Sequence, residues 1–410
     1  MRIAYISTCR PRECGLATFN ENLVQAVDRY LPFAASGSFM VALNDSDDKY
    51  QYDYDERVRF VISQEQLADY QSAAAFINRS GVDMCCIQHE FGIFGGSAGS
   101  HLLALTRALN VPYTVIFHTV LQRPDTMQLS VTQALADGAA KAVVMSKKAV
   151  QLLREVYHIP ANKIQRIPHG VPDFDRPDVA AIKRSLNFPA GKTLLTFGLL
   201  GPNKGLETAI RALPAICKQH PDVRYIILGK THPGIRRTSG EDYRESLHQL
   251  ARQLNVEEHL VFISEFVNEG DLHAYLSACD IYLTPYPNEA QITSGTLSYA
   301  VGAGAAVVST PYWHASELLR GRGKLFDFNN SEQLATIVNG LLSNPSELNQ
   351  LKQHAFKYGL SLRWPIIGKH YALLFENQAA INKKPALLPQ GTFMQVTLSL
   401  SRPLSWKAYS

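Results

Sequence analysis

The sequence predicts an α/β protein of two Rossmann-like domains, each built on a parallel β-sheet, with a cleft between them. Short apolar runs alternate with segments of helical periodicity along the 410-residue chain. This alternation is typical of parallel strands that helices cover on both faces. It pauses at a polar stretch with two prolines, residues 169–177, and then restarts. The length, at roughly 150 residues per domain, also favours two or three domains.

The first half of the chain is expected to contain six buried strands. They are the apolar runs at residues 3–7, 39–43, 58–62, 84–87, 113–117 and 142–145. A helix follows the first run, with apolar residues at every fourth position from Phe19 to Leu31. Thr18 and Glu21 fit a capping box, which places the expected start of this helix near Phe19.

Five further strands are expected in the second half. They are the runs at residues 193–197, 225–228, 260–263, 281–284 and 306–309. A helix near 364–375 is expected to pack back on the first domain. We therefore divide the chain into a first domain at 1–175, a second at 190–365, a returning helix at 366–381 and a tail at 382–410. The hinge is expected at 170–190.

The overall charge is small, because 40 Lys and Arg stand against 36 Asp and Glu, a formal net charge of +4. This balance suits anionic small molecules and argues against a nucleic-acid partner, while a weak contact with a membrane surface stays open. The six cysteines include no Cys-x-x-Cys pair and indicate neither a disulfide framework nor a zinc ribbon. The first residues lack the apolar core of a signal peptide, so we expect a cytoplasmic protein.

Three loops that follow predicted strands of the first half carry candidate binding groups. Gly15 precedes the first helix, where a glycine lets the backbone approach an anion closely. His89 and Glu90 follow the fourth run and could bind hydroxyls or move a proton, unless Glu90 only orients His89. His118 follows the fifth run, either as a cleft residue or as a satisfied core histidine.

Two loops of the second half indicate an anion site. Gly198 and Lys204 lie in a glycine-rich loop between a strand and a helix, where the lysine would neutralise a phosphate. The Walker A spacing is absent. Ser294, Gly295 and Thr296 open another helix, and three free amides with two hydroxyls would form a phosphate cradle there.

Taken together, these segments resemble the retaining glycosyltransferases of the GT-B fold, family 4. The likeness covers roughly residues 1–380, and the order and spacing of the motifs carry it. The matching motifs are the Gly15 loop, His118, Ala142-Val-Val-Met-Ser146, Ile167-Pro-His-Gly-Val171, Gly198…Lys204-Gly205, Tyr225-Ile-Ile-Leu-Gly229, Asp280-Ile-Tyr-Leu-Thr-Pro285 and Gly304…Val307-Val308. A looser likeness, to a branch found with mannoside-degrading enzymes, rests on Thr231-His232-Pro233 and the segments at 291–296 and 309–314.

The resemblance implies roles for individual residues. It implies that His118 meets the transferred sugar and that Lys204 binds the donor phosphate. The family's Glu-x7-Glu pair falls on Gln291 and Tyr299, and its arginine in the second domain's first loop falls on Leu199, which implies an altered donor site. The expected catalytic residues are His118 and Lys204, and the expected substrate-binding residues are Gly15, His89, Glu90, Gly198, Glu289, Gln291, Ser294, Gly295, Thr296 and Tyr299.

The function that the resemblance implies is transfer of a hexose, with mannose as one candidate, from a nucleotide-diphospho-sugar to a carbohydrate acceptor with retention. Neither a metal nor a cofactor is expected, because the resemblance implies a fold whose enzymes generally need no metal. Few catalytic carboxylates are needed, because the departing phosphate oxygen can itself accept the acceptor's proton. Two alternatives stay open. One is a glycoside phosphorylase that uses a sugar 1-phosphate, and the other is a non-catalytic GT-B protein that binds a nucleotide or a glycan. The oligomeric state is not predicted.

Overall fold

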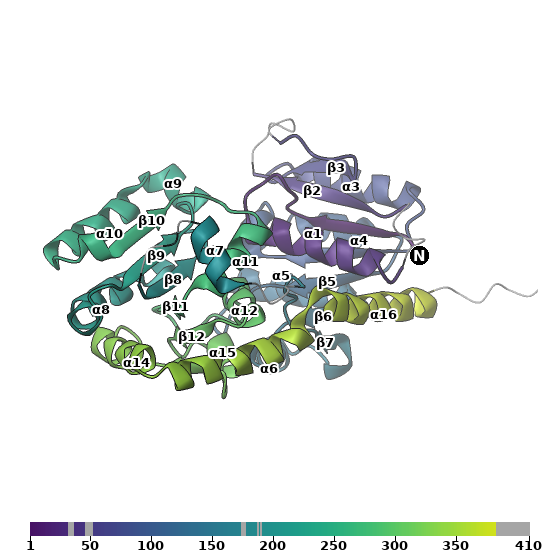
Figure 1. Ribbon diagram of the computed structural model, residues 1–410. Coiled ribbons are helices and arrows are strands. Elements are labelled where there is room, and N and C mark those ends of the chain that lie inside the picture. The colour runs from purple at the N-terminus through teal and green to yellow at the C-terminus, as the bar shows by residue number, and fades with distance from the viewer. Residues whose placement is uncertain (32–36, 46–51, 174–177, 187, 189–190, 383–410) are drawn as a thin grey trace, which may run out of the picture.

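The computed structural model describes residues 1–31, 37–45, 52–173, 178–186, 188 and 191–382. Two α/β domains lie side by side, the first purple to blue and the second teal to green (Figure 1). Each domain contains one sheet in which all the strand pairs are parallel. The predicted fold class, two parallel-sheet domains of the GT-B kind, is thereby confirmed.

The first sheet has seven strands in the order β3-β2-β1-β4-β5-β6-β7. The strands are β1 Ile3–Ser7, β2 Phe39–Asn44, β3 Val58–Ser63, β4 Met84–His89, β5 Tyr113–Phe117, β6 Lys141–Val144 and β7 Ile164–Arg166. The central strands are buried along their whole length, because helices cover both faces. The strand order reverses between β1 and β4, and such a switch point opens a crevice at the carboxyl ends of the strands.

The helices of the first domain divide between the two faces of its sheet. They are α1 Gly15–Asp28, α3 Leu67–Arg79, α4 Leu102–Ala108, α5 Thr126–Gly138 and α6 Lys147–Glu155. One core contains Tyr70, Leu105 and Leu135 from α3, α4 and α5. The opposite core contains Leu23 and Val27 of α1. The helical period predicted from Phe19 onward is thus the buried stripe of α1.

The second sheet has six strands in the order β10-β9-β8-β11-β12-β13, with its switch point between β8 and β11. The strands are β8 Thr193–Phe197, β9 Arg224–Leu228, β10 Leu260–Ile263, β11 Ile281–Thr284, β12 Ala306–Ser309 and β13 Gly323–Leu325. The helices are α7 Val179–Ser185, α8 Leu206–Gln219, α9 Pro233–Ser239, α10 Asp242–Gln253, α11 Glu269–Ala278, α12 Gly295–Gly302, α13 Trp313–Leu318, α14 Ser331–Ser343 and α15 Pro345–Gly359.

The two passages of the chain between the domains lie side by side. The Val171 amide donates to the Leu362 carbonyl at 2.9 Å, and the Trp364 amide donates to the Val171 carbonyl at 2.8 Å. After this crossing, α16 (Trp364–Asn382) runs along α1 of the first domain (Figure 1). Tyr371 and Phe375 of α16 are buried in that domain's core. The helix expected at 364–375 therefore covers the first sheet, although it belongs to the end of the chain.

Three local features differ from the sequence-based expectation. The strands β7 and β13 are not predicted by the pattern, because these three-residue edge strands are half exposed and lack an apolar run. Helix α1 begins at Gly15 and not near Phe19. Its cap is Cys14, whose Sγ accepts a hydrogen bond from the Ala17 amide at 3.3 Å, while Glu21 pairs with Arg10.

Parts of the expected hinge (174–177, 187, 189–190) and of the expected tail (383–410) lie outside the described residues.

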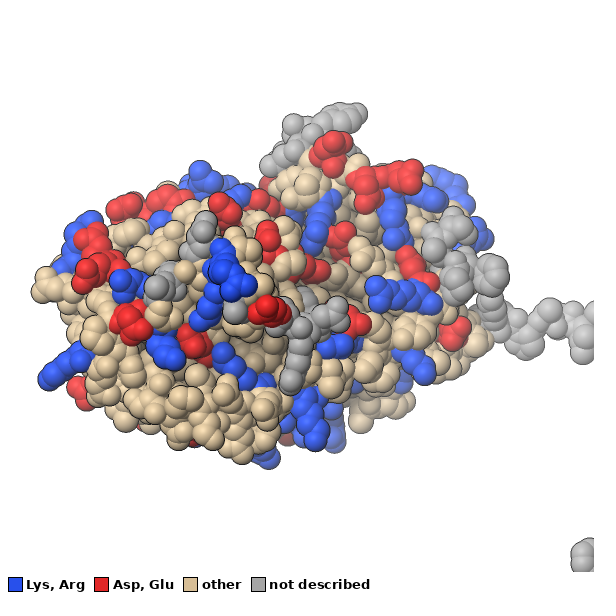
Figure 2. Space-filling view, viewed as in Figure 1, with Lys and Arg blue, Asp and Glu red and all other residues tan. Residues whose placement is uncertain are grey.

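Charged side chains of both signs are interspersed on the face of the molecule that Figure 2 shows. Ion pairs join the two domains: Glu13 contacts Lys230 at 2.7 Å, and Glu317 contacts Arg166 at 3.8 Å. Within the described part of the chain, no helix is both long and apolar enough to span a bilayer.

Candidate active site in the interdomain cleft

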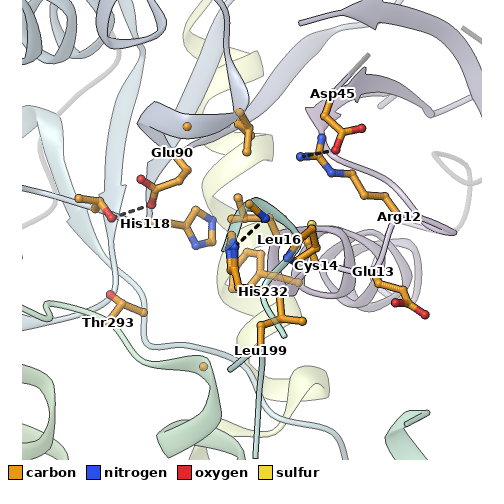
Figure 3. Close-up of a pocket in the computed structure, with 18 of the residues that line it drawn as sticks. Arg12, Glu13, Cys14, Leu16, Asp45, Glu90, His118, Leu199, His232 and Thr293 are labelled. Carbon is orange, nitrogen blue, oxygen red and sulfur yellow. Dashed lines mark hydrogen bonds and ion pairs between the residues drawn. The ribbon is translucent and has the colours of Figure 1, made fainter. Parts of the chain in front are cut away.

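The cleft between the domains contains two adjoining cavities of about 800 and 330 Å³. Side chains of both domains line each of them. In the larger cavity, Cys14 lies at the start of α1, Glu90 and His118 follow β4 and β5, and Leu199 and His232 come from the second domain (Figure 3). The site thus lies where the carboxyl ends of the two sheets face each other, as expected for open α/β sheets.

A small group of residues lines both cavities and marks their junction. These residues are Gly15, Phe19, His169, Leu199, His232 and Gly295. Phe19 lies at the centre of an aromatic cluster, with ring centroids 4.9 Å from His118, 5.0 Å from His169 and 5.2 Å from Trp364. Since Phe19 is buried and packed on three sides, the junction has a rigid wall.

The larger cavity presents groups suited to hydroxyls. Nε2 of His118 donates to Oε1 of Gln88 at 2.8 Å. Burial, with smaller contributions from His169 and His89, lowers the pKa of His118 to about 3, so its imidazole is neutral near pH 7. The Thr119 hydroxyl donates to Glu90 at 2.6 Å. Burial also raises the pKa of Glu90 above its ordinary value. These side chains offer hydrogen-bonding groups to a ligand.

The smaller cavity carries the lysine that the sequence singled out. Nζ of Lys204 donates to the Tyr286 hydroxyl at 3.0 Å, and that hydroxyl lies 2.9 Å from the Thr296 hydroxyl. Burial alone would raise the pKa of Tyr286, but the Lys204 charge and hydrogen bond lower it below the ordinary value. Gly198 has φ +127°, and a Cβ there would lie 3.2 Å from Thr296. A glycine therefore keeps the space between Lys204 and α12 open.

The amino end of α12 forms the other wall of the smaller cavity. The Ser294 hydroxyl caps the helix by accepting from the Leu297 amide at 3.2 Å, and the Ser294 amide donates to Nδ1 of His314 at 2.9 Å. In the hydrogen-bond network of the described residues, the Gly295 and Thr296 amides have no acceptor. The expected cradle of three amides and two hydroxyls is thus smaller, because His314 and the cap occupy Ser294. Two amides and the Thr296 hydroxyl, close to Lys204, form an anion-binding corner.

Tyr299, where the family places a glutamate, is held by both domains. Its hydroxyl donates to Glu269 at 2.8 Å and accepts from Asn22 of α1 at 3.2 Å. The side chain is only 6% exposed and lines the smaller cavity. Burial, and next the negative charge of Glu269, raise the pKa of Tyr299 well above its ordinary value. Tyr299 thus offers its ring to the cavity and its hydroxyl to the domain interface.

Most of the residues expected at the site line the cleft. Glu90, His118 and Gln291 line the larger cavity; Gly198, Lys204, Thr296 and Tyr299 line the smaller one; and Gly15 and Gly295 line both.

Three expected substrate-binding residues do not line either cavity. His89 is fully buried beside Phe91, Phe94 and Phe117, because its side chain points from β4 into the core. Glu289 is exposed outside the cleft. The Ser294 hydroxyl caps α12 by accepting from the Leu297 amide and does not face either cavity. The sequence pattern locates the loops, but the direction of each side chain comes from the packing.

Sequence reasoning does not select Phe19, His169 or His232, which line the junction. His169 and His232 lie in motifs that carry the resemblance, Ile167-Pro-His-Gly-Val171 and Thr231-His232-Pro233. The motifs therefore point to these two positions, but they do not indicate what the side chains do. Phe19 is assigned only to the buried stripe of its helix. No group of three or more potential metal ligands occurs in the described ranges.

Family models match both halves of the chain. The model of the glycosyl transferases group 1 matches residues 178–358, and that of glycosyltransferase family 4 matches residues 41–173.

Curated relatives match about half of this chain, and the chain spans about half of their length. A GDP-mannose-dependent alpha-(1-6)-phosphatidylinositol monomannoside mannosyltransferase of Mycolicibacterium smegmatis is 28% identical over 198 residues, which are 45% of this chain and 49% of the relative. A phosphatidyl-myo-inositol mannosyltransferase of Mycobacterium tuberculosis is 29% identical over 211 residues, 50% of each chain.

Solved structures share the whole fold at low identity. HepE of Anabaena in complex with UDP aligns with a TM-score of 0.73 at 16% identity, covering 92% of this chain and 100% of its own. Sucrose-phosphate synthase of Thermosynechococcus elongatus aligns with a TM-score of 0.76 at 16% identity, covering 93% of this chain and 100% of its own.

Proposed function

Because this chain belongs to glycosyltransferase family 4 and has the GT-B fold, we propose that it transfers a hexose from a nucleotide-diphospho-hexose to a carbohydrate acceptor with retention. The observation that carries the proposal is the anion-binding corner, where Lys204 and the free amides of Gly295 and Thr296 meet in a cavity at the switch point of the second sheet. This corner suits a diphosphate.

The smaller cavity is the proposed donor site. Its 330 Å³ volume and its apolar walls, which include Leu228, Phe266 and Leu272, suit the flat base and ribose of a nucleotide. Solved neighbours whose names include UDP and UDP-glucose support a nucleotide-sugar donor. GDP-mannose is the first donor to test, since one of the curated relatives is named as a GDP-mannose-dependent enzyme.

The larger cavity is the proposed acceptor site. Glu90 and Thr119 offer hydrogen-bonding groups to the hydroxyls of the acceptor sugar, and Asp45 lies between Arg12 and Arg237 at 3.6 and 3.5 Å. The charges of these two arginines are therefore partly satisfied within the protein. A carbohydrate suits a cavity of this kind, in which a few polar groups fix the orientation of the ligand.

The chemistry then needs no carboxylate nucleophile. The bond between the anomeric carbon and the donor phosphate breaks, and a hydroxyl of the acceptor forms the new glycosidic bond on the same face of the sugar. The hydroxyl's proton passes to the departing phosphate oxygen, and the products are the glycoside and the nucleoside diphosphate. Lys204 and the two amides stabilise the charge that develops on the phosphate. The neutral His118 hydrogen-bonds to the transferred sugar.

Ligand-induced thermal shifts, followed by a transfer assay, test the proposal. GDP, UDP, ADP and hexose 1-phosphates are screened first, because a ligand that binds the folded state raises its melting temperature. GDP-mannose and UDP-glucose are then incubated with methyl α-mannoside, and NMR reports the anomeric configuration of the product. Binding of a nucleotide and a retained product are expected.

The alternatives predict different outcomes of the same assay. A shift with mannose 1-phosphate alone, together with phosphorolysis of a mannoside, would indicate a phosphorylase. Binding of a nucleotide or a glycan without turnover would indicate a non-catalytic protein. An inverted product would contradict retention while leaving hexosyl transfer intact.

A further inference from the structure

His169 occupies the junction of the two cavities, although neither the local sequence nor the family likeness assigns it a role. It lines the larger cavity, the smaller cavity and a third small cavity of about 20 Å³ beside His314. The side chain is only 8% exposed. A polar ring that is buried so deeply needs a partner or a ligand for each of its nitrogens.

The backbone around His169 is fixed by the crossing between the domains. A Cβ on Gly170 would lie 2.4 Å from the Trp364 ring, so this position requires a glycine. The next residue, Val171, makes the two hydrogen bonds with Leu362 and Trp364 that join the two passages of the chain. His169 therefore projects into the cleft from a stretch of backbone that the crossing of the two chain passages holds in place.

Its environment determines which nitrogen carries the proton. Nδ1 of His169 donates to the Gly170 carbonyl at 2.7 Å. A carbonyl only accepts, so Nδ1 holds the hydrogen and Nε2 holds a lone pair. Burial lowers the pKa of His169 to about 4, and the imidazole is therefore neutral near pH 7.

The lone pair faces the anion-binding corner. A methyl group added at Gly295 would lie 3.2 Å from Nε2 of His169, and Gly295 is the first residue of α12. The Phe19 ring packs against the imidazole at 5.0 Å and Tyr299 lies on another side at 6.2 Å, which leaves the ring little freedom to turn. Nε2 is thus a fixed acceptor directly beside the expected position of the departing phosphate.

We propose that His169 is a catalytic residue whose Nε2 accepts a hydrogen bond from the attacking hydroxyl of the acceptor. This inference rests on the proposed function. In a retaining transfer the attacking hydroxyl and the departing oxygen lie on one face of the sugar, so they meet at the junction of the donor and acceptor cavities. His169 orients the oxygen lone pair of that hydroxyl toward the anomeric carbon. The single hydrogen of that hydroxyl lies between Nε2 and the departing phosphate oxygen, and both accept from it. As the glycosidic bond forms, this hydrogen passes to the phosphate oxygen, and His169 stays neutral throughout the step.

Two substitutions separate this role from a structural one. His169→Asn keeps an amide near the position of Nδ1 but removes the acceptor at Nε2, whereas His169→Gln carries an amide oxygen to about the place of Nε2. His259→Asn is the matched control, because His259 is equally buried, 9% exposed, and bonds to the Val223 carbonyl at 2.9 Å outside the cleft. Each variant is assayed with GDP-mannose and UDP-glucose, both for transfer to methyl α-mannoside and for slow hydrolysis without an acceptor.

His169→Asn is expected to lower kcat for transfer at least about tenfold, the scale of one lost hydrogen bond to a reacting group. Donor hydrolysis, the Kd for GDP or UDP and the melting temperature should change less than about twofold or 2 °C, and His169→Gln should recover part of kcat. Transfer at the wild-type rate in His169→Asn would overturn the inference and leave the proposed function standing. A parallel loss of transfer, hydrolysis and thermal stability would also overturn it, in favour of a structural role. Absence of both transfer and nucleotide binding in the wild type would instead reject the proposed function, and this inference with it.

Discussion

Lys204 shows how a single residue acquires a role from its surroundings. Its ammonium group lies 3.0 Å from the Tyr286 hydroxyl and 4.6 Å from the centre of the Tyr286 ring. The hydrogen bond to the Tyr286 hydroxyl and the aromatic ring hold the ammonium group at one corner of the cavity, whereas the side chain of an exposed lysine is free to move. Preorganised charge of this kind stabilises a departing phosphate without reorganisation during the reaction.

Replacing Lys204 with Ala is expected to cost about 2–3 kcal/mol of transition-state stabilisation, roughly a hundredfold in kcat/KM. Folding should be retained, since Lys204 is half-buried at the cavity wall. Lys218→Ala, an exposed position at the far end of α8, is the control and should keep the wild-type kcat/KM. A folded Lys204→Ala protein with normal kcat/KM would remove this residue from the donor site.

At the scale of elements, the turn between β8 and α8 is what places Lys204. Gly205 is in the left-handed region at φ +59°, and it directly precedes the first residue of α8. A Cβ at this position would lie 2.1 Å from the Pro285 carbonyl oxygen, which belongs to the loop after β11. The two loops that form the anion-binding corner are thus packed together through a position that only glycine fits.

Gly205→Ala should therefore destabilise the protein by about 1–3 kcal/mol and also lower kcat/KM, because Lys204 moves with the loop. Gly321→Ala provides the control for backbone strain alone: it has φ +71°, but nothing lies within 4 Å of the added Cβ. Denaturant unfolding and kinetics of the two variants separate the effects. Equal stability losses in both, with full activity in Gly205→Ala, would show that the contact with Pro285 does not position the lysine.

At the scale of the whole molecule, several histidines are buried in the neutral form. Burial lowers the pKa of His89, His118 and His314 to about 3 and that of His169 to about 4, from an ordinary value of 6.5. Below pH 6.5, and above their folded pKa values, these histidines bind a proton in the unfolded chain but not in the folded protein. Their contribution to stability is therefore complete above pH 6.5 and is lost progressively as the pH falls toward 3–4.

The free energy of unfolding should decrease between pH 7.5 and 5.5, with each of these histidines contributing on the order of 1 kcal/mol. His89→Phe tests this directly, because both ring nitrogens of His89 lack a partner among the described residues and its neighbours are phenylalanines. The variant should show a smaller difference between the two pH values, by on the order of 1 kcal/mol. Transfer activity should persist, since His89 lines neither cavity. An unchanged pH dependence would mean that His89 titrates normally.

The elements and their order follow from local patterns in the chain. The apolar runs predict strands such as Tyr113–Phe117 and Ile281–Thr284 with their observed bounds, because a strand buried on both faces needs a continuous apolar run. Parallel topology then places the ends of these strands at one edge, so the sequence alone predicts that the loops carrying His118, Lys204 and Gly295 meet at the cleft. Apolar pattern and turn chemistry are local properties, and local properties can be read from one sequence.

Which side chains reach the cleft depends instead on tertiary packing. His89 and Glu90 are adjacent in the sequence, yet the first turns into the core and the second lines a cavity. His169 belongs to a stretch that reads as a linker, and it lies at the junction because the crossing chains at Val171 and Trp364 hold it there. Tyr299 bonds to Asn22, 277 positions away. The direction of a side chain depends on what packs against it from distant parts of the chain, and such contacts leave no periodic signal in a single sequence.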